Sequence, residues 1–223
     1  MRIASVIGSP HGMEGMTGQL LQPLLTAARE AGAEVTALSL ADLQVQPCRA
    51  CDCCHRIGTC RQDDDFEQVR GAIEAADGLV LASPNYIFSV SAQMKALLDR
   101  CCGPLHLQAF EGKYGAAVVT SGGPGSVQVE KYLLRFLRNL GMWTVGSIGA
   151  EGRQFADPSA REPVFEASGR LGTRLADSIY RKAKFPDQES DRRDFYDRMK
   201  MLVTMRREEW PYEYEYWRKK GRV

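Results

Sequence analysis

The chain has 223 residues, of which 44% are hydrophobic and 26% charged, and it carries 29 Lys and Arg against 28 Asp and Glu. Because positive and negative charges nearly balance, the chain has no broad basic surface that would attract nucleic acid or an anionic membrane. Small-molecule or protein partners are favoured. Residues 1–10 hold one basic residue and too short an apolar run for a signal peptide, and no stretch reaches the roughly 18 apolar residues that span a bilayer. We therefore expect one large cytoplasmic domain with an appended end.

Apolar, strand-like segments alternate with helix-length amphipathic segments over the first 150 residues. The predicted strands are residues 2–9, 34–40, 78–84, 115–123 and 143–150. The predicted helices are residues 18–33, 63–76, 91–102 and 128–141. Right-handed crossovers place such helices on both faces of a parallel sheet. The sequence therefore predicts an α/β fold with a doubly wound, five-stranded parallel sheet.

Two helix starts carry local signals. Pro23 lies inside the first helical pattern, so we expect that helix to begin only a few residues earlier or to bend at the proline. A serine, Ser89 or Ser91, is expected to cap the third helix.

Strand patterns end after about residue 153, and residues 162–183 and 191–210 are predicted as helices. Beyond them, aromatic side chains occupy alternate positions, at Trp210, Tyr212, Tyr214 and Tyr216. This spacing predicts an extended tail with one aromatic face. We expect that face to pack on the protein's own sheet or on a neighbouring subunit.

Three loops follow strands at the carboxyl edge of the predicted sheet, where open α/β folds bind ligands. The first, residues 8–19, combines glycines and hydroxyls with a helix N-terminus, which attracts phosphate; Ser9 and Thr17 supply donors. It lacks the Walker and GxGxxG patterns, so a monophosphate fits better than a nucleotide triphosphate or dinucleotide. The alternative is a plain connection between strand and helix.

The other two loops offer surface for a flat ligand. In residues 83–95, Pro84 fixes the backbone and Tyr86, Ile87 and Phe88 present apolar surface at the strand end, although such residues also close cores. The glycines of residues 120–126 permit close approach of a ligand edge.

Five of the seven cysteines fall in the stretch PCRACDCCHRIGTC, residues 47–60. An odd number in one segment argues against a disulfide framework and for ligation or redox chemistry. Cys48, Cys51, Cys54 and Cys60 follow the spacing C-x2-C-x2-C-x5-C, which resembles ferredoxin runs that bind iron–sulfur clusters. Zinc sites normally use two separated knuckles. An iron–sulfur cluster, a metal-free cysteine loop and zinc remain open at this point.

The remaining candidates receive structural interpretations. We expect Cys53, Cys101 and Cys102 to be small buried apolar residues. His55 is interpreted as a solvated loop histidine, with a hydrogen bond to a cluster as the alternative, and His106 has no partner in sequence. No nucleophile elbow is present, so hydrolysis has no support.

Taken together, the three loops resemble the NADPH-dependent FMN reductase family, which has a flavodoxin-like fold. The matching stretches are residues 8–21, 76–100 and 118–123. The resemblance implies FMN, with its phosphate in the first loop and its ring between the other two. It carries over to Ser9, His11, Met16, Thr17, Gly18, Pro84, Asn85, Tyr86, Ile87, Phe88, Ser121, Gly122 and Gly123. His11 stands where relatives commonly have arginine, and Asn85 where they have a small or β-branched residue.

The cysteine loop, with the DDDF that follows it at residues 63–66, resembles the iron–sulfur flavoprotein branch of that family. There the four cysteines hold a [4Fe–4S] cluster, which implies Cys48, Cys51, Cys54 and Cys60 as ligands here. The resemblance implies an FMN-dependent oxidoreductase that passes electrons from ferredoxin or NAD(P)H to an acceptor, as a homodimer or homotetramer. We assign no side chain as an acid or base.

This interpretation divides the chain at residue 185. Residues 1–185 are expected to form the flavodoxin-like FMN-binding domain, with the cysteine loop at 47–62 after the second strand. Residues 186–223 form a helical extension with the aromatic tail, within the same domain or at an oligomer interface. Two alternatives remain: a cluster-free NAD(P)H-dependent FMN or quinone reductase, and a zinc-stabilised, non-catalytic interaction module.

Overall fold

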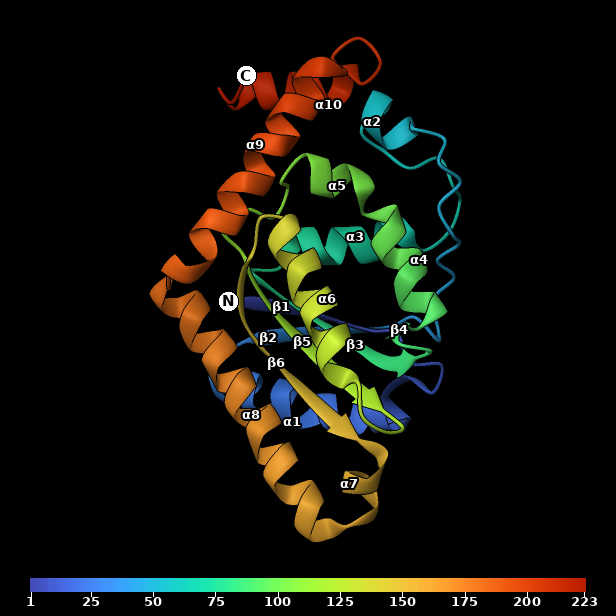
Figure 1. Cartoon of the computed structure of the whole chain (residues 1–223), viewed down its shortest axis with the longest axis vertical. Helices are drawn as coiled ribbons and strands as arrows, with labels where there is room; N and C mark the ends of the chain where they lie inside the picture. The colour runs from blue at the N-terminus through green and yellow to red at the C-terminus, as the bar shows by residue number, and fades with distance from the viewer.

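The computed structural model describes all residues, 1–223, and is built on a parallel sheet (Figure 1). Its path runs β2–β1–β3–β5–β6, with bounds β1 Arg2–Ile7, β2 Glu34–Ser39, β3 Gly78–Tyr86, β5 Tyr114–Ser121 and β6 Trp143–Glu151. A sixth strand, β4 (Ser89–Val90), pairs antiparallel with the end of β3. The predicted α/β class and parallel sheet are confirmed. The count of five strands is wrong, because β3 continues past Pro84 and folds back into a short hairpin.

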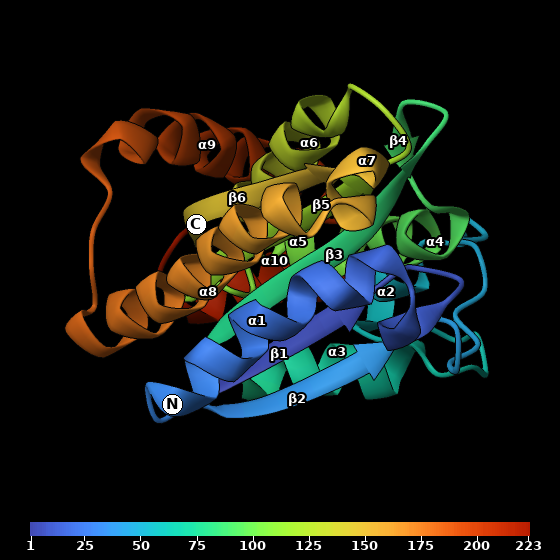
Figure 2. The same cartoon turned by 90° about the horizontal axis from the view of Figure 1, so that it is seen from below.

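Helices cover both faces of the sheet (Figure 2). α1 (Met16–Glu30) and α8 (Pro158–Arg181) lie on one face, and α3 (Phe66–Ala75), α4 (Ala92–Arg100) and α6 (Ser126–Asn139) lie on the other. Because side chains alternate along a strand, Val80 of β3 packs in the core beneath α1 and α8, while Leu79 and Leu81 pack in the core on the opposite face of the sheet. None of the helices combines the length and apolar character needed to cross a membrane.

The starts of α1 and α4 answer the two questions that Pro23 and the candidate capping serines raised. α1 begins at Met16 and keeps Pro23 in its interior. Ser91 caps α4, since its hydroxyl accepts a hydrogen bond from the Met94 N–H at 3.2 Å, whereas Ser89 belongs to β4. Short elements complete the chain: η1 (Gly12–Glu14), α2 (Cys53–Ile57), α5 (Cys102–His106), α7 (Gly152–Ala156) and η2 (Pro186–Gln188).

The C-terminal extension comprises α9 (Glu189–Met205) and α10 (Pro211–Lys219). The predicted helices at 162–183 and 191–210 are confirmed as α8 and α9, but the extended tail is wrong because its residues form α10. Pro211 presets the first helical turn, and the four-residue spacing places Glu213 and Trp217 together on a buried face. Trp217 packs with Leu107, Met199 and Val203 in a small separate core. The tail thus packs near α2 and α5 instead of on the sheet (Figure 1).

Candidate cofactor sites

The loop after β1 forms a tight turn at the start of α1. Ser9 and Thr17 are buried, and the Thr17 hydroxyl lies 2.6 Å from that of Thr120 at the end of β5. Gly18 leaves no room for a side chain, because a Cβ there would lie 2.2 Å from the Met13 carbonyl oxygen. The first N–H groups of α1 have no partners within the helix, so this turn is a suitable place for a phosphate group.

The second loop is the β3–β4 hairpin. Ile87 and Phe88 have left-handed backbones, with φ of 48° and 63°, and their side chains are 91% and 79% exposed. Tyr86 is also exposed, whereas Pro84 is buried. Asn85 carries a buried Oδ1 with no hydrogen-bond partner. The hairpin therefore offers both apolar surface and an unused acceptor.

The third loop follows β5. A Cβ added at Gly122 or Gly123 would meet no atom within 4 Å, so open space lies beside the backbone here, next to the buried Ser121. Because β1, β3 and β5 are neighbours in the sheet, the three predicted loops lie at one edge. The unpartnered Asn85 oxygen and the space at the two glycines fit the polar edge of a flavin. His11 and Met16 belong to this edge but are exposed.

Two buried serines, Ser83 and Ser91, join two of these loops, and of the two only Ser91 was expected, as a helix cap. The Ser91 hydroxyl donates to the Gly8 carbonyl oxygen at 2.5 Å, and the Ser83 hydroxyl accepts from the Ser91 N–H at 3.0 Å. A Cβ at Gly8 would lie 2.7 Å from the Met94 Cβ, so α4 packs directly on the first loop. Its N-terminal serine therefore fixes the spacing between the phosphate turn and the hairpin.

The cysteine loop precedes α3 and turns sharply at two non-glycine residues with left-handed backbones, Ala50 and Asp52. Cys48 and Cys51 are exposed, and Cys54 and Cys60 are half-buried. Cys53 was expected to be buried, but it is half-exposed and lies in the same loop as the exposed Cys51. The extra cysteine therefore belongs to the thiol-rich surface and not to the core.

The acidic stretch after the cysteines anchors the loop. Asp64 forms a bidentate ion pair with Arg100 of α4, at 2.7 and 3.0 Å, and the two side chains are 3% and 1% exposed. Asp64 also accepts a hydrogen bond from the Gln46 N–H at 2.8 Å, at the entrance to the loop. Although burial opposes ionisation, the hydrogen bonds from Arg100 and from backbone N–H groups hold the pKa of Asp64 below its usual value.

A cavity of about 250 Å³ opens beside the loop. Cys54 and Cys60 line it together with Arg100 and with Arg70, which is ion-paired to two further lining residues, Glu67 and Glu74. Thiolates are the ligands that iron–sulfur clusters prefer, and nearby guanidinium groups offset their negative charge. The four predicted thiols do not approach one another as ligands of a single ion do. Their donor type and the neighbouring Arg100 fit a cluster, which holds its cysteines apart on separate iron atoms.

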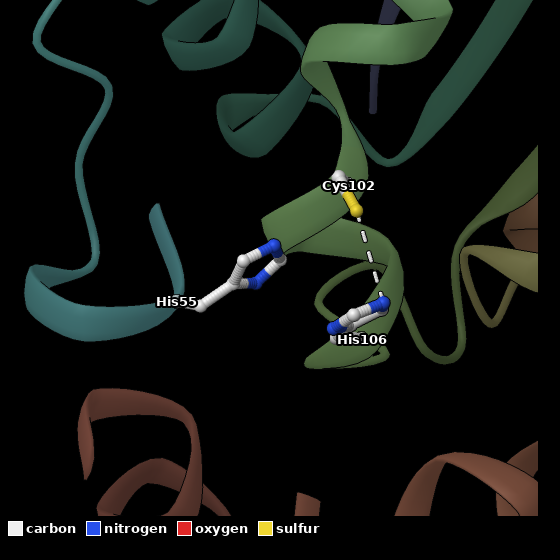
Figure 3. Close-up of side chains that lie close together, drawn as sticks. All are labelled: His55, Cys102 and His106. Atoms are coloured by element: carbon white, nitrogen blue, oxygen red, sulfur yellow. Dashed lines mark hydrogen bonds between the residues drawn. The ribbon is translucent and has the colours of Figure 1, made fainter. Parts of the chain in front are cut away.

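Two histidines beside the loop are buried, so the expectation of a solvated His55 is wrong. His55 is 5% exposed, and its Nδ1 lies 2.5 Å from Glu213 Oε1; Nδ1 of His106 lies 3.1 Å from Glu213 Oε2. Cys101 is buried as expected, but Cys102 is half-buried, and its Sγ lies 3.7 Å from His106 Nε2 (Figure 3). The sequence could not show these partners, because Glu213 is 158 residues from His55.

Mutual contacts set the charges in this cluster. Burial opposes charging of His55, yet contacts with the Cys102 and Cys54 thiols and with Glu213 raise its pKa to about 12. Burial likewise opposes charging of His106, but Cys102 and Glu213 raise its pKa to about 9. Burial disfavours the Cys102 thiolate, but hydrogen bonds to His106 and His55 bring its pKa down to about 6.

Comparison with known proteins identifies the family and the fold. The family model of NADPH-dependent FMN reductases matches residues 1–155. An iron–sulfur flavoprotein of Archaeoglobus fulgidus is 28% identical over 225 residues and spans 99% of both chains; a second from this archaeon is 32% identical over 174 residues, covering 74% of this chain and 87% of the relative. A solved flavodoxin from the domain Archaea has a TM-score of 0.54 at 16% identity, over 81% of this chain and 99% of that one. The chain belongs to the iron–sulfur flavoprotein branch of the NADPH-dependent FMN reductase family and has its flavodoxin-like fold.

Proposed function

We propose that this protein is an FMN-dependent oxidoreductase that passes electrons between a donor and an acceptor through FMN and a [4Fe–4S] cluster. The observation that carries the proposal is the presence of two complementary sites in one chain. One is the loop edge with the unpartnered Asn85 oxygen and the space at Gly122 and Gly123. The other is the cysteine loop with the cavity that Arg100 lines. The names of the iron–sulfur flavoprotein relatives support the same pairing.

At the loop edge, the start of α1 with Ser9 and Thr17 would hold the FMN phosphate through N–H and hydroxyl donors. Asn85 Oδ1 would accept a hydrogen bond from the ring edge, and the hairpin side chains Ile87 and Phe88 would cover the ring and exclude water. When bound, FMN supplies exchange of one or two electrons. The chain's contribution is to bind and orient the ring, and we assign no side chain as an acid or base.

At the cysteine loop, Cys48, Cys51, Cys54 and Cys60 would hold the cluster. When bound, the cluster supplies single-electron transfer. Arg100 lines the same cavity as Cys60 and is held there by Asp64, so its positive charge would offset the negative charge of the thiolate ligands. The ion pair therefore fixes the Arg100 guanidinium, at the end of α4, beside the cysteine loop.

The electron donor, the assembly and the compartment complete the proposal. We propose ferredoxin or NAD(P)H as the electron donor, and a homodimer or homotetramer as the assembly. The exposed Ile87 and Phe88 supply apolar surface that suits a subunit contact above the flavin. The seven free cysteines suit a reducing compartment such as the cytoplasm. Residues 1–185 would form the FMN-binding unit, with residues 186–223 covering its cysteine loop.

The test is anaerobic purification with iron, sulfide and flavin analysis of the wild type and of Cys51→Ala. We expect about four iron and four sulfide per chain, together with one FMN, in the wild type. Because Cys51 is exposed, its replacement should leave the fold and the flavin in place. The loss of one of the four proposed ligands should remove the iron. Cys101→Ala, in the core, is the matched control and should keep both.

Each other outcome changes the proposal. Stoichiometric iron in Cys51→Ala would refute the ligand assignment. Flavin without iron in the wild type would select a cluster-free FMN or quinone reductase, and zinc without flavin would select a non-catalytic module. A colourless protein from anaerobic purification would refute both cofactors.

A further inference from the structure

A second group of metal-ligating side chains lies where α2, α5 and α10 meet, outside the four-cysteine set. His55 comes from α2, and Cys102 and His106 are the first and last residues of α5, one turn apart. The ligand atoms of the three all lie within 4.8 Å of one another. Figure 3 shows the two imidazole rings below the Cys102 side chain, with the His106 nitrogen directed at the sulfur. Two nitrogens and one sulfur therefore converge from two separate segments.

Glu213 fixes which nitrogens face the sulfur. Its carboxylate is fully buried and lies within hydrogen-bond distance of Nδ1 of both His55 and His106. With each Nδ1–H donating to the carboxylate, the Nε2 atoms remain available, and His106 Nε2 is the atom 3.7 Å from Cys102 Sγ. A histidine whose second nitrogen donates to a carboxylate is the usual arrangement behind metal ligands. One glutamate here performs that role for two histidines.

The walls hold both rings in place. The rings stack on each other with centroids 4.7 Å apart, and Trp210 lies 4.6 Å from His55 and 5.2 Å from His106. Trp217 donates from Nε1 to the His106 carbonyl oxygen at 3.1 Å. The donors are therefore positioned by packed elements and not by a mobile loop, as a metal site requires.

The charges also suit a divalent cation. In such a site the ligands are neutral imidazole and deprotonated thiol, and the buried carboxylate of Glu213 adds a second negative charge beside the cation.

We propose that His55 Nε2, Cys102 Sγ and His106 Nε2 bind one Zn²⁺, separate from the iron–sulfur cluster, with Glu213 holding both imidazoles. Two imidazoles and a thiolate are ligands that zinc prefers, and three protein ligands leave a fourth tetrahedral position. Asp52 Oδ1, 4.0 Å from His55 Nε2, supplies an oxygen donor beside that position. The zinc would join the cysteine loop to α5, and Glu213 of the C-terminal extension would hold both histidines from behind. Since Cys54 and His55 are adjacent in the chain, the two metal centres would be neighbours.

The experiment measures zinc and iron separately in anaerobically purified holoprotein that has been incubated with Zn²⁺ and dialysed. We expect one zinc per chain in addition to the iron. X-ray absorption at the zinc edge should show one sulfur at about 2.3 Å and nitrogens at about 2.0–2.1 Å. This method reports the zinc ligands directly, without interference from flavin or iron.

Variants outside residues 48–60 identify the ligands. His106→Gln and Cys102→Ser should lose the zinc while keeping iron and FMN, and Glu213→Gln should weaken zinc affinity by about 10–100-fold. Cys101→Ala, which changes the adjacent buried cysteine, should keep the zinc. The retained iron and flavin show in the same sample that the variant is folded.

Three results would overturn the proposal: no zinc bound by a wild type that carries iron and flavin, unchanged zinc in both ligand variants, or a zinc spectrum without sulfur. If the variants fail to fold, the wild-type spectrum alone decides. The two metals also separate this inference from the proposed function. Iron without zinc refutes only the zinc site, and zinc at these ligands without iron refutes only the cluster.

Discussion

The flavin edge and the cysteine region of this protein are assembled in different ways. At the flavin edge, three loops leave adjacent strands, so the sheet topology alone brings Thr17 to Thr120 and Ser91 to Gly8. In the cysteine region, His55 and His106 meet a glutamate from the last helix of the chain. The first kind of site follows from strand order, whereas the second depends on how a terminal segment packs back. Perturbations of one region that do not displace α4, which connects Ser91 to Arg100, should therefore leave the other region intact.

The largest effect is expected from the buried ion pair of the cysteine region. Asp64→Ala leaves the Arg100 guanidinium buried and unpaired, so we expect the free energy of unfolding to fall by about 3–5 kcal/mol in urea denaturation. Asp63→Ala, at the exposed neighbouring aspartate, is the control and should change little. Equal effects of the two variants would show that Asp64 does not anchor the loop.

A pair of glycine variants tests whether the two regions are independent. Gly58 has φ +81°, and a Cβ there would lie 2.3 Å from the Tyr212 ring; at Gly18 a Cβ would meet the Met13 backbone. We expect each alanine variant to lose about 1–3 kcal/mol of stability by overpacking. Gly58→Ala should speed hydrogen exchange in α10 with FMN affinity unchanged, and Gly18→Ala should weaken FMN binding with α10 unchanged.

The control for this pair is Gly71→Ala in the interior of α3. A Cβ there meets no atom within 4 Å, so alanine should stabilise the helix by roughly 0.5–1 kcal/mol. If Gly58→Ala weakened FMN binding as much as Gly18→Ala does, the two regions would be coupled and the comparison would fail.

A smaller loss of stability is expected when the buried hydroxyl pair of Thr17 and Thr120 at the flavin edge is broken. Thr17→Val removes one partner of a buried hydroxyl pair and leaves Thr120 unsatisfied, so we expect a loss of about 1–2 kcal/mol. The double variant Thr17→Val, Thr120→Val should recover part of that loss, because neither polar group then remains buried alone. Thermal unfolding of the four proteins in a double-mutant cycle measures the coupling, and additive losses would contradict it.

The smallest effect is a pH dependence in the cysteine region. Because the folded pKa of Asp64 is lowered, its stabilisation is complete above the unfolded value near pH 3.9 and is lost as the pH falls through the folded pKa. The difference in unfolding free energy between wild type and Asp64→Asn should therefore be constant from pH 7 to about 5 and shrink below about 4. A difference that stayed constant in acid would contradict the lowered pKa.

The sheet and its helices could be predicted because their signals are local. Apolar strand segments and helical spacing fixed the doubly wound class, and Ser91 was found by its capping position. The C-terminal pattern was ambiguous, since aromatic residues at 210, 212, 214 and 216 suit a strand, while Glu213 and Trp217 suit one face of a helix. The prediction of an extended tail rested on the aromatic spacing alone and left out Pro211, which favours a helix start.

The polar partners of the cysteine region could not be predicted, for a physical reason. A buried histidine needs a partner, but that partner can lie anywhere along the chain, and for His55 and His106 it is Glu213. The spacing of Cys102 and His106 is one helical turn, which was the one local signal of their contact. The flavin-site and cluster-ligand assignments stay predictions, and the experiments above test them.

The closure of the cysteine region by the last helix also orders events during synthesis. Glu213 follows His55 by 158 residues, which at ordinary translation speeds is roughly 10–30 s. Throughout that interval the cavity that Cys54 and Cys60 line lacks Tyr212 and Tyr216, which the arriving helix then adds to its wall. A ribosome stalled short of residue 211 would thus present a nascent chain whose cavity beside the cysteine loop has not yet received its C-terminal wall.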